Sequence, residues 1–336
     1  KLLEMIFTDY SKVQNLILAY PERFSNEYES LTLFYDALID IIPNDIQLWI
    51  ISNNNVTCQK LTNRYRYKTV NTIGIKNWDE IWLRDCIGIN TTTDELIKPY
   101  YHPQYCTQSR DSSYFEHLNK QSRIIVKECL KKKMVFMPLY LDGGNFISNT
   151  STVFLTNKIL EDNRELSKSE VVHILQDFTG LRPEIIERSK SDNVGHTDGI
   201  INFLSENMVL LSNYPSLPFL KPDIDLLYEV RKKLEEEKLD VVDFYDRPVD
   251  EIVPCECYRK TKKACIYSAR GNYINFLRLN NTIILPEYTL PTIKESRYYN
   301  MRNAEILHEL GFEVKTINCD QLSKMGGSLH CLSYTF

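Results

Sequence analysis

The sequence predicts an α/β fold built as one domain over residues 1–336. Helical and strand patterns alternate from one end of the chain to the other, and no linker rich in proline, glycine or serine separates them. The composition, 43% hydrophobic and 25% charged over 336 residues, is that of an ordinary globular protein. A chain of this length can bury most of its apolar surface without disulfides or metals.

In the first half of the chain, four segments show clear periodicity. Asn26–Ile42 carries apolar residues at helical spacing, and the apolar run Ile46–Ser52 reads as a buried strand. Thr152–Thr156 is a short run of β-forming residues. A helix is expected over Ser169–Thr179, and it should end at Gly180 because glycine is common just past a helix end.

The second half continues the alternation. Asp223–Leu239 is the clearest amphipathic helix, with apolar side chains on one side and lysines and glutamates on the other. The other elements are two strand pairs, a helix and a last strand: Ile200–Phe203 with Met208–Leu211, Tyr273–Leu277 with Thr282–Leu285, Ser296–Leu310, and Phe312–Ile317. The order strand, turn, strand, helix recurs, but no period is sharp enough to indicate a repeat.

The mild excess of acidic over basic residues limits the kinds of molecule that the protein is expected to bind. A net charge of −5 and a pI near 5.8 argue against a general binder of nucleic acid or anionic membranes, and they suit a cationic substrate. No apolar run approaches the ~20 residues needed to span a bilayer, and no signal segment is present. We therefore expect a cytoplasmic protein, although the chain begins with Lys1, which leaves open what preceded it.

The nine cysteines are scattered and odd in number, so they cannot all pair within the chain. Cys255 and Cys257, with Cys265 nearby, suggest zinc, but no second cluster completes four ligands. Reduced thiols and no metal are the simpler interpretation.

Two of the segments that could carry chemistry contain acidic residues. In Trp82-Leu83-Arg84-Asp85, apolar neighbours would shelter Asp85, so its carboxylate needs a cationic partner. That partner is either a substrate guanidinium, which matches two carboxylate oxygens, or Arg84 in a structural salt bridge. The segment Asp142-Gly143-Gly144-Asn145 is either a plain turn or a place where the backbone approaches another group closely.

Two further segments contain histidine and cysteine. If Gly195-His196-Thr197-Asp198-Gly199 begins a strand, His196 and Asp198 project to one face and form either a general acid/base unit or a structural pair. Cys331 follows Gly326-Gly327 and is either a buried, inert thiol or a nucleophile. His330 is not expected to be its base, because adjacent residues of a strand point in opposite directions.

In this order, the four segments resemble the agmatine deiminase family, which belongs to a guanidine-modifying superfamily with peptidylarginine and arginine deiminases. The shared pattern is Trp-x-Arg-Asp, an acidic residue with Gly-Gly-Asn, His-x-Asp, and Gly-Gly-x-x-His-Cys near the carboxyl end. The segments Tyr10–Tyr20, Tyr273–Tyr288 and Cys319–Cys331 are similar too, so the resemblance covers nearly the whole chain.

The resemblance implies a fold and an activity. The fold would be the pentein fold, a five-bladed, pseudo-symmetric α/β propeller of ββαβ-type units around a central polar channel, and a homodimer is possible. The activity would be hydrolysis of agmatine to N-carbamoylputrescine and ammonia, a step of polyamine biosynthesis. It would proceed through a covalent thiouronium on cysteine, without a metal or an organic cofactor.

The resemblance also implies roles for particular residues. Cys331 would be the nucleophile and His196 the general acid and base, while Asp85 and Asp198 would grip the guanidinium. Asp142, Asn145 and Trp82 would support the site or bind the substrate. Positive charge from His196 and the substrate should lower the pKa of the thiol.

This sequence departs from the family pattern at three places, which leaves the substrate less certain than the chemistry. Cys86-Ile87-Gly88 follows Asp85, Asp142 replaces a glutamate, and Ile201-Asn202-Phe203 lacks an arginine. Free arginine or peptidyl-arginine is the first alternative to agmatine. The carboxylate of free arginine, or the carbonyl of a peptide, would need a hydrogen-bond donor such as an arginine at the channel mouth. Arg270, Arg278 and Arg297 are candidates. A non-catalytic cation binder is a second alternative; a cysteine protease lacks its local signature.

Overall fold

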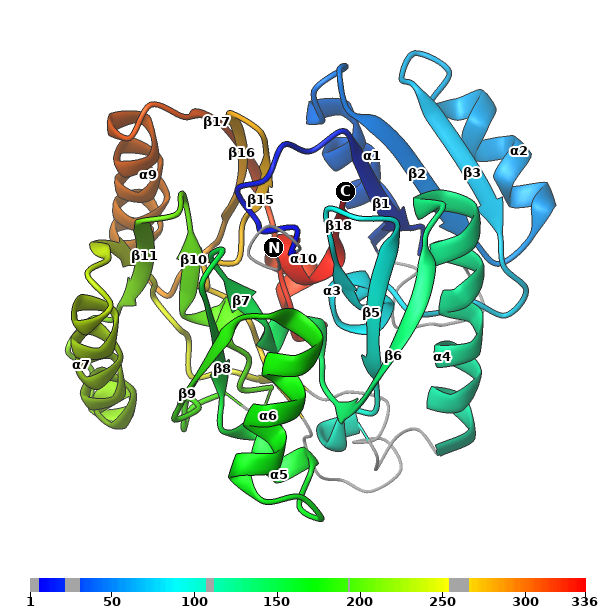
Figure 1. Cartoon of the computed structure of the whole chain (residues 1–336). Coiled ribbons are helices and arrows are strands. Elements are labelled where there is room, and N and C mark those ends of the chain that lie inside the picture. The colour runs from blue at the N-terminus through cyan, green and yellow to red at the C-terminus, as the bar shows by residue number, and fades with distance from the viewer. Residues whose placement is uncertain (1–5, 22–30, 107–111, 193, 254–265) are drawn as a thin grey trace.

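The computed structural model describes residues 6–21, 31–106, 112–192, 194–253 and 266–336. Within these ranges the chain has a mixed α/β fold in which long helices surround the strands (Figure 1). Four sheets share one connection pattern: two antiparallel strands form a hairpin, and a helix then leads to a third strand parallel to the second. A fifth sheet has the same strand directions, but its antiparallel pair comes from the two ends of the chain. The order strand, turn, strand, helix that recurs in the sequence thus corresponds to a structural unit that is repeated in the fold.

Four of the sheets follow one another along the chain. Their strands are β4 (Ile89–Asn90), β5 (Glu95–Tyr100) and β6 (Lys133–Tyr140); β7 (Ile147–Ser148), β8 (Thr152–Thr156) and β9 (Arg182–Ile186); β10 (Ile201–Phe203), β11 (Met208–Asn213) and β12 (Asp240–Tyr245); and β15 (Leu277–Leu279), β16 (Thr282–Glu287) and β17 (Glu313–Asn318). A two-stranded ladder of β13 (Ile252–Val253) and β14 (Ile266–Tyr267) lies between the last two.

The remaining sheet joins the two ends of the chain. Its order is β18 (Tyr334–Thr335), β1 (Asn15–Ala19), β2 (Gln47–Ser52) and β3 (Val70–Gly74), with β18 antiparallel to β1. In Figure 1 the blue amino-terminal strand and the red carboxyl-terminal segment meet at the middle of the molecule. The segment that carries Cys331 is therefore anchored by the first strand of the chain.

The helices that connect the strands lie outside the sheets. They are α1 (Thr32–Ile41), α2 (Asn55–Arg64), α4 (Ser112–Ile125), α5 (Lys158–Asp162), α6 (Lys168–Thr179), α7 (Lys221–Glu236) and α9 (Ile293–Glu309). In α7, Leu227, Val230 and Leu234 are buried, because residues three and four apart share one face of a helix. These side chains pack on β10 and β11, and comparable apolar clusters fill the space behind the other sheets.

Most predicted elements are confirmed, with shifted ends. The helix predicted over Ser296–Leu310 is α9, and the helix predicted over Ser169–Thr179 is α6, which ends before Gly180. The first predicted helix begins only at Thr32, and residues 26–30 of that prediction lie outside the described residues. The predicted strand Tyr273–Leu277 is largely wrong, because β15 begins at Leu277 and the preceding residues form a turn that reaches the site.

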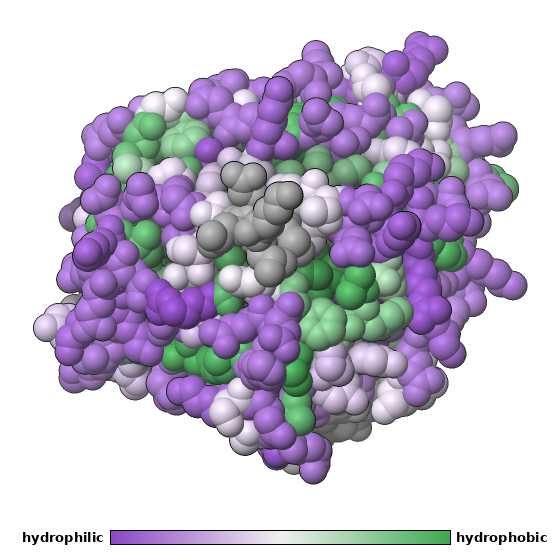
Figure 2. Space-filling model, viewed as in Figure 1, coloured by the Kyte–Doolittle hydropathy of each residue, from purple (hydrophilic) through white to green (hydrophobic). Residues whose placement is uncertain are grey.

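Two further expectations concern the molecule as a whole. The described strands form separate sheets and no closed sheet joins them, so the five-bladed closure stays a prediction. Within the described ranges, no helix is long and apolar enough to cross a membrane. Hydrophilic side chains cover most of the face shown in Figure 2, with apolar areas between them.

Candidate active site

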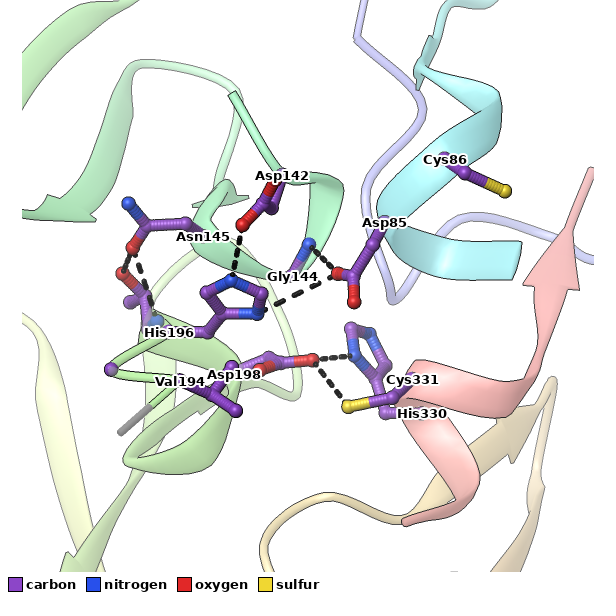
Figure 3. A network of polar contacts seen from close by, with 12 residues as sticks. Asp85, Cys86, Asp142, Gly144, Asn145, Val194, His196, Asp198, His330 and Cys331 are labelled. Carbon is purple, nitrogen blue, oxygen red and sulfur yellow. Dashed lines mark hydrogen bonds and ion pairs between the residues drawn. The ribbon is translucent and has the colours of Figure 1, made fainter. Parts of the chain in front are cut away.

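Five turns meet at the centre of the molecule, and each one immediately precedes the first strand of a sheet. Four of them are short helical turns: α3 (Leu83–Ile87), η4 (Gly143–Asn145), η5 (Thr197–Gly199) and α11 (Leu329–Leu332). The fifth is the irregular segment that ends at Asn275, two residues before β15. The repeated hairpins thus deliver side chains from distant parts of the sequence to one place (Figure 3).

Gly144 marks the point on which the candidate groups converge. A Cβ atom at this position would lie 2.8 Å from Asp85 Oδ1, 2.8 Å from His196 Nδ1 and 2.9 Å from Asp198 Oδ2. The Gly144 N–H donates to Asp85 Oδ1 at 2.9 Å. Of the two interpretations of Gly143-Gly144, close backbone approach is therefore confirmed, since only glycine leaves room at this position.

His196 is held between two carboxylates. Its Nε2 is 2.9 Å from Asp142 Oδ2, and its Nδ1 is 3.6 Å from Asp85 Oδ1, too far for a hydrogen bond. Burial opposes protonation, but the charges of Asp85 and Asp142 outweigh it and raise the pKa of His196 to about 9. The ring is thus an imidazolium whose Nδ1 has no hydrogen-bond partner among the described residues and faces Asp85.

The two carboxylates beside His196 have opposite pKa shifts. Burial is the main reason that the pKa of Asp85 is raised, to about 6. Asp142 is equally buried, but Lys158 at 2.9 Å and His196 outweigh the burial and hold the pKa of this carboxyl well below its usual range. Lys158 also pairs with Asp162, which completes a buried charge network that the sequence reasoning missed. A buried lysine at the start of a helix gave no local signal.

Asp198 contacts both Cys331 and its neighbour. Its Oδ2 lies 3.5 Å from Cys331 Sγ and 2.8 Å from His330 Nδ1. The other ring nitrogen of His330 is 3.1 Å from Asp9 Oδ1, so this imidazole bridges two carboxylates. Although burial opposes ionisation, these contacts lower the pKa of Asp198 and favour its charged form.

Arg84 does not make the salt bridge with Asp85 that was one of the two interpretations. Its Nη1 lies 3.3 Å from Asp9 Oδ1 instead. Asp85 is left without an arginine partner among the described residues. Asp9 and His330 were not assigned roles from the sequence, because the link between them spans the two ends of the chain.

Cys331 lies in a helical turn, not in a strand, so the argument from alternating strand residues does not apply to it. Its Sγ is 3.3 Å from Asn275 Oδ1, and its backbone N–H also donates to that oxygen, at 3.3 Å. Burial, Asp198 and Asp85 raise the pKa of this thiol well above its ordinary value. Positive charge from His196 alone therefore does not lower the pKa of this thiol as expected, because burial and then the two carboxylates outweigh it.

Asn145 and Trp82, which the resemblance implies as supporting or substrate-binding residues, occupy structural positions. The side-chain oxygen of Asn145 accepts hydrogen bonds from the backbone and hydroxyl groups of Thr156 and Thr197. The Trp82 ring lies against Gly327, where a Cβ would be 2.5 Å from a ring carbon. Asn145 holds η5 in place, and Trp82 supports the loop before Cys331; contact with a substrate stays a prediction for both.

A cavity of about 210 Å³ leads to the sulfur. Its wall includes His196, Asp198, Asn275 and Cys331, together with residues of the loops before β13 and β15. This is at the small end of the volumes found for ligand sites. The described residues contain no group of three or more histidine, cysteine, aspartate or glutamate side chains that could hold a metal. Cys255, Cys257 and Cys265 lie outside them.

Comparisons with known proteins show a similar fold in several solved structures. An agmatine deiminase from C. jejuni is 17% identical, with a TM-score of 0.77 over 98% of this chain and 95% of the other. The agmatine deiminase of Enterococcus faecalis is 15% identical, with a TM-score of 0.75 over 99% and 95%. A dimethylarginine dimethylaminohydrolase has a TM-score of 0.55 at 13% identity, over 96% and 100%. Among curated proteins there is no match.

Fold and family together define a deiminase-type, guanidine-modifying hydrolase. The model of the family described as Porphyromonas-type peptidyl-arginine deiminase matches residues 5–336. This chain belongs to that family. The resemblance to agmatine deiminases and their relatives that the four motifs indicate is thereby confirmed.

Proposed function

We propose that this protein hydrolyses the guanidinium group of a small substrate to a ureido group and ammonia, with Cys331 as the nucleophile. One observation carries the proposal: Asp85, His196 and Asp198 all approach the space in front of Gly144, and the Cys331 sulfur contacts Asp198. A planar cation fits between two carboxylates, since each can accept two of its N–H groups. Its carbon would then face the sulfur.

Binding of the substrate would activate the thiol. Besides burial, the charges of Asp198 and Asp85 disfavour the thiolate. A guanidinium between Asp85 and Asp198 would neutralise that effect, because an adjacent positive charge stabilises a thiolate. The cysteine thus becomes reactive only when a cation occupies the site.

The chemistry would proceed in two stages. The thiol loses its proton to solvent as the sulfur bonds to the guanidinium carbon. His196 donates its proton to one nitrogen, and the bond from that nitrogen to carbon breaks to release ammonia, which leaves His196 neutral. A water molecule then attacks the remaining thiouronium and gives a proton to His196. The carbon–sulfur bond breaks, which regenerates the thiol and leaves the ureido product.

The resemblance makes agmatine the first candidate substrate, and two neighbours are named as agmatine deiminases. A C. jejuni agmatine deiminase in which serine replaces a cysteine is described with substrate bound. An arginine-type substrate is the second candidate, favoured by Arg270 in the wall of the cavity. We also propose that the five sheets are the blades of a pentein propeller; a homodimer and a cytoplasmic location stay predictions.

The proposal is tested by measuring ammonia and ureido product from agmatine, L-arginine and arginine peptides. Cys331→Ala should lower kcat by at least 10³-fold, because the covalent route is lost. Cys58→Ala is the matched control, since Cys58 is a buried thiol in α2, away from the site. Intact mass of quenched wild-type reactions should show the thiouronium adduct, and Cys331→Ala should not.

Two results would contradict the proposal. If the wild-type protein turned over none of these guanidines, it would be a binder of cations and not a hydrolase. If Cys331→Ala kept the wild-type rate, a different group would be the nucleophile.

A further inference from the structure

A second cation contacts the carboxylate that holds His196. Asp142 Oδ2 lies 2.9 Å from His196 Nε2 and also 2.9 Å from Lys158 Nζ. Lys158 pairs in addition with Asp162, four residues further along α5. Opposite charges thus alternate along one row of side chains: Asp162, Lys158, Asp142 and His196. No more than 6% of any of these side chains is exposed, so solvent screens their charges little.

The fold places Lys158 next to the loop of His196. Lys158 begins α5, one residue after strand β8 ends. The last residue of β8, Thr156, donates its hydroxyl to Gly195 O at 2.6 Å, so this strand end is fixed to the residue before His196. The Lys158 ammonium also lies 5.6 Å from the centre of the Tyr105 ring. Lys158 is not among the described residues that line the cavity, so it lies beside the proposed substrate site and not in it.

The protonation of His196 depends on groups from several elements. Burial opposes it, Asp85 and Asp142 favour it and raise the pKa to about 9, and Lys158 acts against these carboxylates. The titratable and charged groups that face the ring are Asp85 from α3, Tyr105 from η2 (Gln104–Cys106), Asp142 before η4, Lys158 and Asp162 from α5, and Asp192 and Asp198 from its own loop. Among these described groups, Lys158 is the cation.

Proton donation by His196 changes the charge balance of the row. While His196 is protonated, two cations, His196 and Lys158, match two carboxylates, Asp142 and Asp162. Once the proton has gone to the departing nitrogen, Asp142 faces a neutral imidazole. A buried carboxylate without a cationic partner is strongly unfavourable. Because Lys158 contacts the same oxygen as His196, it keeps Asp142 paired after the proton has left.

We infer that Lys158 is a positioning residue for the hydrolysis, which holds the charge of Asp142 so that His196 can release its proton to the departing nitrogen. This inference rests on the proposed hydrolysis at Cys331. Lys158 acts through Asp142 and touches no reacting atom. Without Lys158, His196 should bind its proton more tightly, because release of that proton would leave Asp142 buried and unpaired.

The test uses the double variant Lys158→Met/Asp162→Asn. It removes the ammonium together with its second carboxylate, since loss of one partner of a buried ion pair can unfold a protein. NMR of ¹⁵N-labelled histidines follows the titration of His196 in the ligand-free protein, and the signal is assigned by its absence from His196→Gln. The wild-type ring should titrate near pH 9. The ring of the double variant should titrate at a pH higher by about one.

Steady-state kinetics should change in the same sense. The alkaline limb of kcat/KM should move to higher pH together with the NMR titration. At neutral pH, kcat should fall by about 3- to 10-fold, because an acid that holds its proton more tightly donates it less readily. KM should change little, since Lys158 lies outside the cavity wall. A merely structural role would lower activity without moving either titration.

Asp162→Asn is the matched control, because it leaves Lys158 on Asp142. Loss of a negative charge cannot raise the pKa of a nearby imidazole, so His196 should titrate at the wild-type pH or below it. Thermal unfolding should show that both variants are folded. An unchanged or lower titration of His196 in the double variant, or an equal rise in Asp162→Asn, would overturn the inference. Absence of guanidine turnover by the wild-type protein would contradict the proposed hydrolysis, whereas the NMR titration reports on Lys158 independently.

Discussion

At the scale of single residues, the site is organised around groups whose charges control one another. Asp85 and Asp142 raise the pKa of His196, while burial, Asp198 and Asp85 raise the pKa of Cys331. In the proposed mechanism, His196 is thus an acid ready to donate its proton, and Cys331 is a nucleophile that is not yet ionised. A bound guanidinium would offset the charges of Asp198 and Asp85 that raise the pKa of Cys331. Substrate binding would therefore promote ionisation of the thiol.

The pH dependence of kcat/KM should show this charge arrangement. Activity should rise as pH increases through about 6, because Asp85 must be ionised to hold a cation. It should fall as pH increases through about 9, because His196 must carry a proton for the departing nitrogen. Steady-state rates from pH 5 to 10 measure both limbs.

The variant Asp142→Asn tests whether His196 is the group that titrates at the alkaline limb. Removing this carboxylate removes one of the two charges that raise the pKa of His196, so the alkaline limb should move to lower pH. The acid limb should also move to lower pH, because the charge of Asp142 helps to raise the pKa of Asp85. An alkaline limb unchanged in Asp142→Asn would mean that His196 is not the group that titrates there.

Gly144 is the residue at which the smallest change should have a large effect. Its φ is not positive, so alanine is compatible with its backbone, but the added methyl would lie within 3 Å of three catalytic groups. Displacing these groups by about 1 Å should lower kcat/KM by about 10²-fold or more. Steady-state kinetics and thermal unfolding of Gly144→Ala measure activity and stability separately.

Gly311→Ala is the contrasting variant. Gly311 has a φ of +90° with open space around it, far from the site in a turn after α9. Alanine there should lower stability by about 1 kcal/mol and leave kcat/KM unchanged. Wild-type activity in Gly144→Ala would show that the space in front of Gly144 is not where the substrate binds.

At the scale of elements, the hairpins determine where the functional groups lie. Each of the five turns ends within four residues of the first strand of its sheet, so the antiparallel pair of strands fixes its position. This regularity also accounts for Asn275. It was missed in the sequence because asparagine has no distinctive chemistry, but it precedes β15 as Asp198 precedes β10. Comparison of equivalent positions in the repeated units is the signal that could have found it.

Strand β18 gives a direct test of this positioning. Tyr334 is buried, pairs with Ile17 in β1 and donates its hydroxyl to Gly88 O at 3.0 Å. Tyr334→Ala should lower the free energy of unfolding by about 3–5 kcal/mol through the cavity it leaves. It should also lower activity, because Cys331 lies only three residues away. Urea unfolding and the ammonia assay measure the two effects.

Tyr228→Ala is the control for this prediction. Tyr228 lies in α7 with 69% of its surface exposed, so its removal should change stability by no more than about 0.5 kcal/mol. A loss of stability in Tyr334→Ala no larger than in this control would mean that pairing of the two chain ends does not hold the molecule together.

At the scale of the whole molecule, the two ends of the chain pair with each other in one sheet. The Phe336 carbonyl accepts the Gln14 and Asn15 N–H groups at 3.0 and 2.8 Å, and Asp9 contacts His330 beside the nucleophile. The amino-terminal segment therefore completes the same sheet that positions Cys331 and also supplies Asp9 to the buried polar network beside Cys331. Residues 6–21 are part of the site and not an appendage to it.

The sequence by itself determined the class of the fold, most helices and strands, and the four segments that carry chemistry. The spacing of apolar residues along the chain shows which face of a helix or strand is buried, and the residue types limit the chemistry that a site can perform. Both can therefore be inferred from the linear sequence. The resemblance of the ordered motifs to a family then implied roles for Cys331, His196, Asp85 and Asp198. In the folded chain Asp85, His196 and Asp198 converge in front of Gly144, and the Cys331 sulfur contacts Asp198.

Only the tertiary structure decided which groups face one another. Arg84 pairs with Asp9 instead of Asp85, Lys158 neutralises Asp142, and two carboxylates hold Cys331 in its thiol form. Local sequence could not show these relations, because each joins residues that are many positions apart and depends on distances of a few ångströms. Electrostatic interactions between buried groups change steeply over such distances, so the charge state of the site is a property of the folded chain.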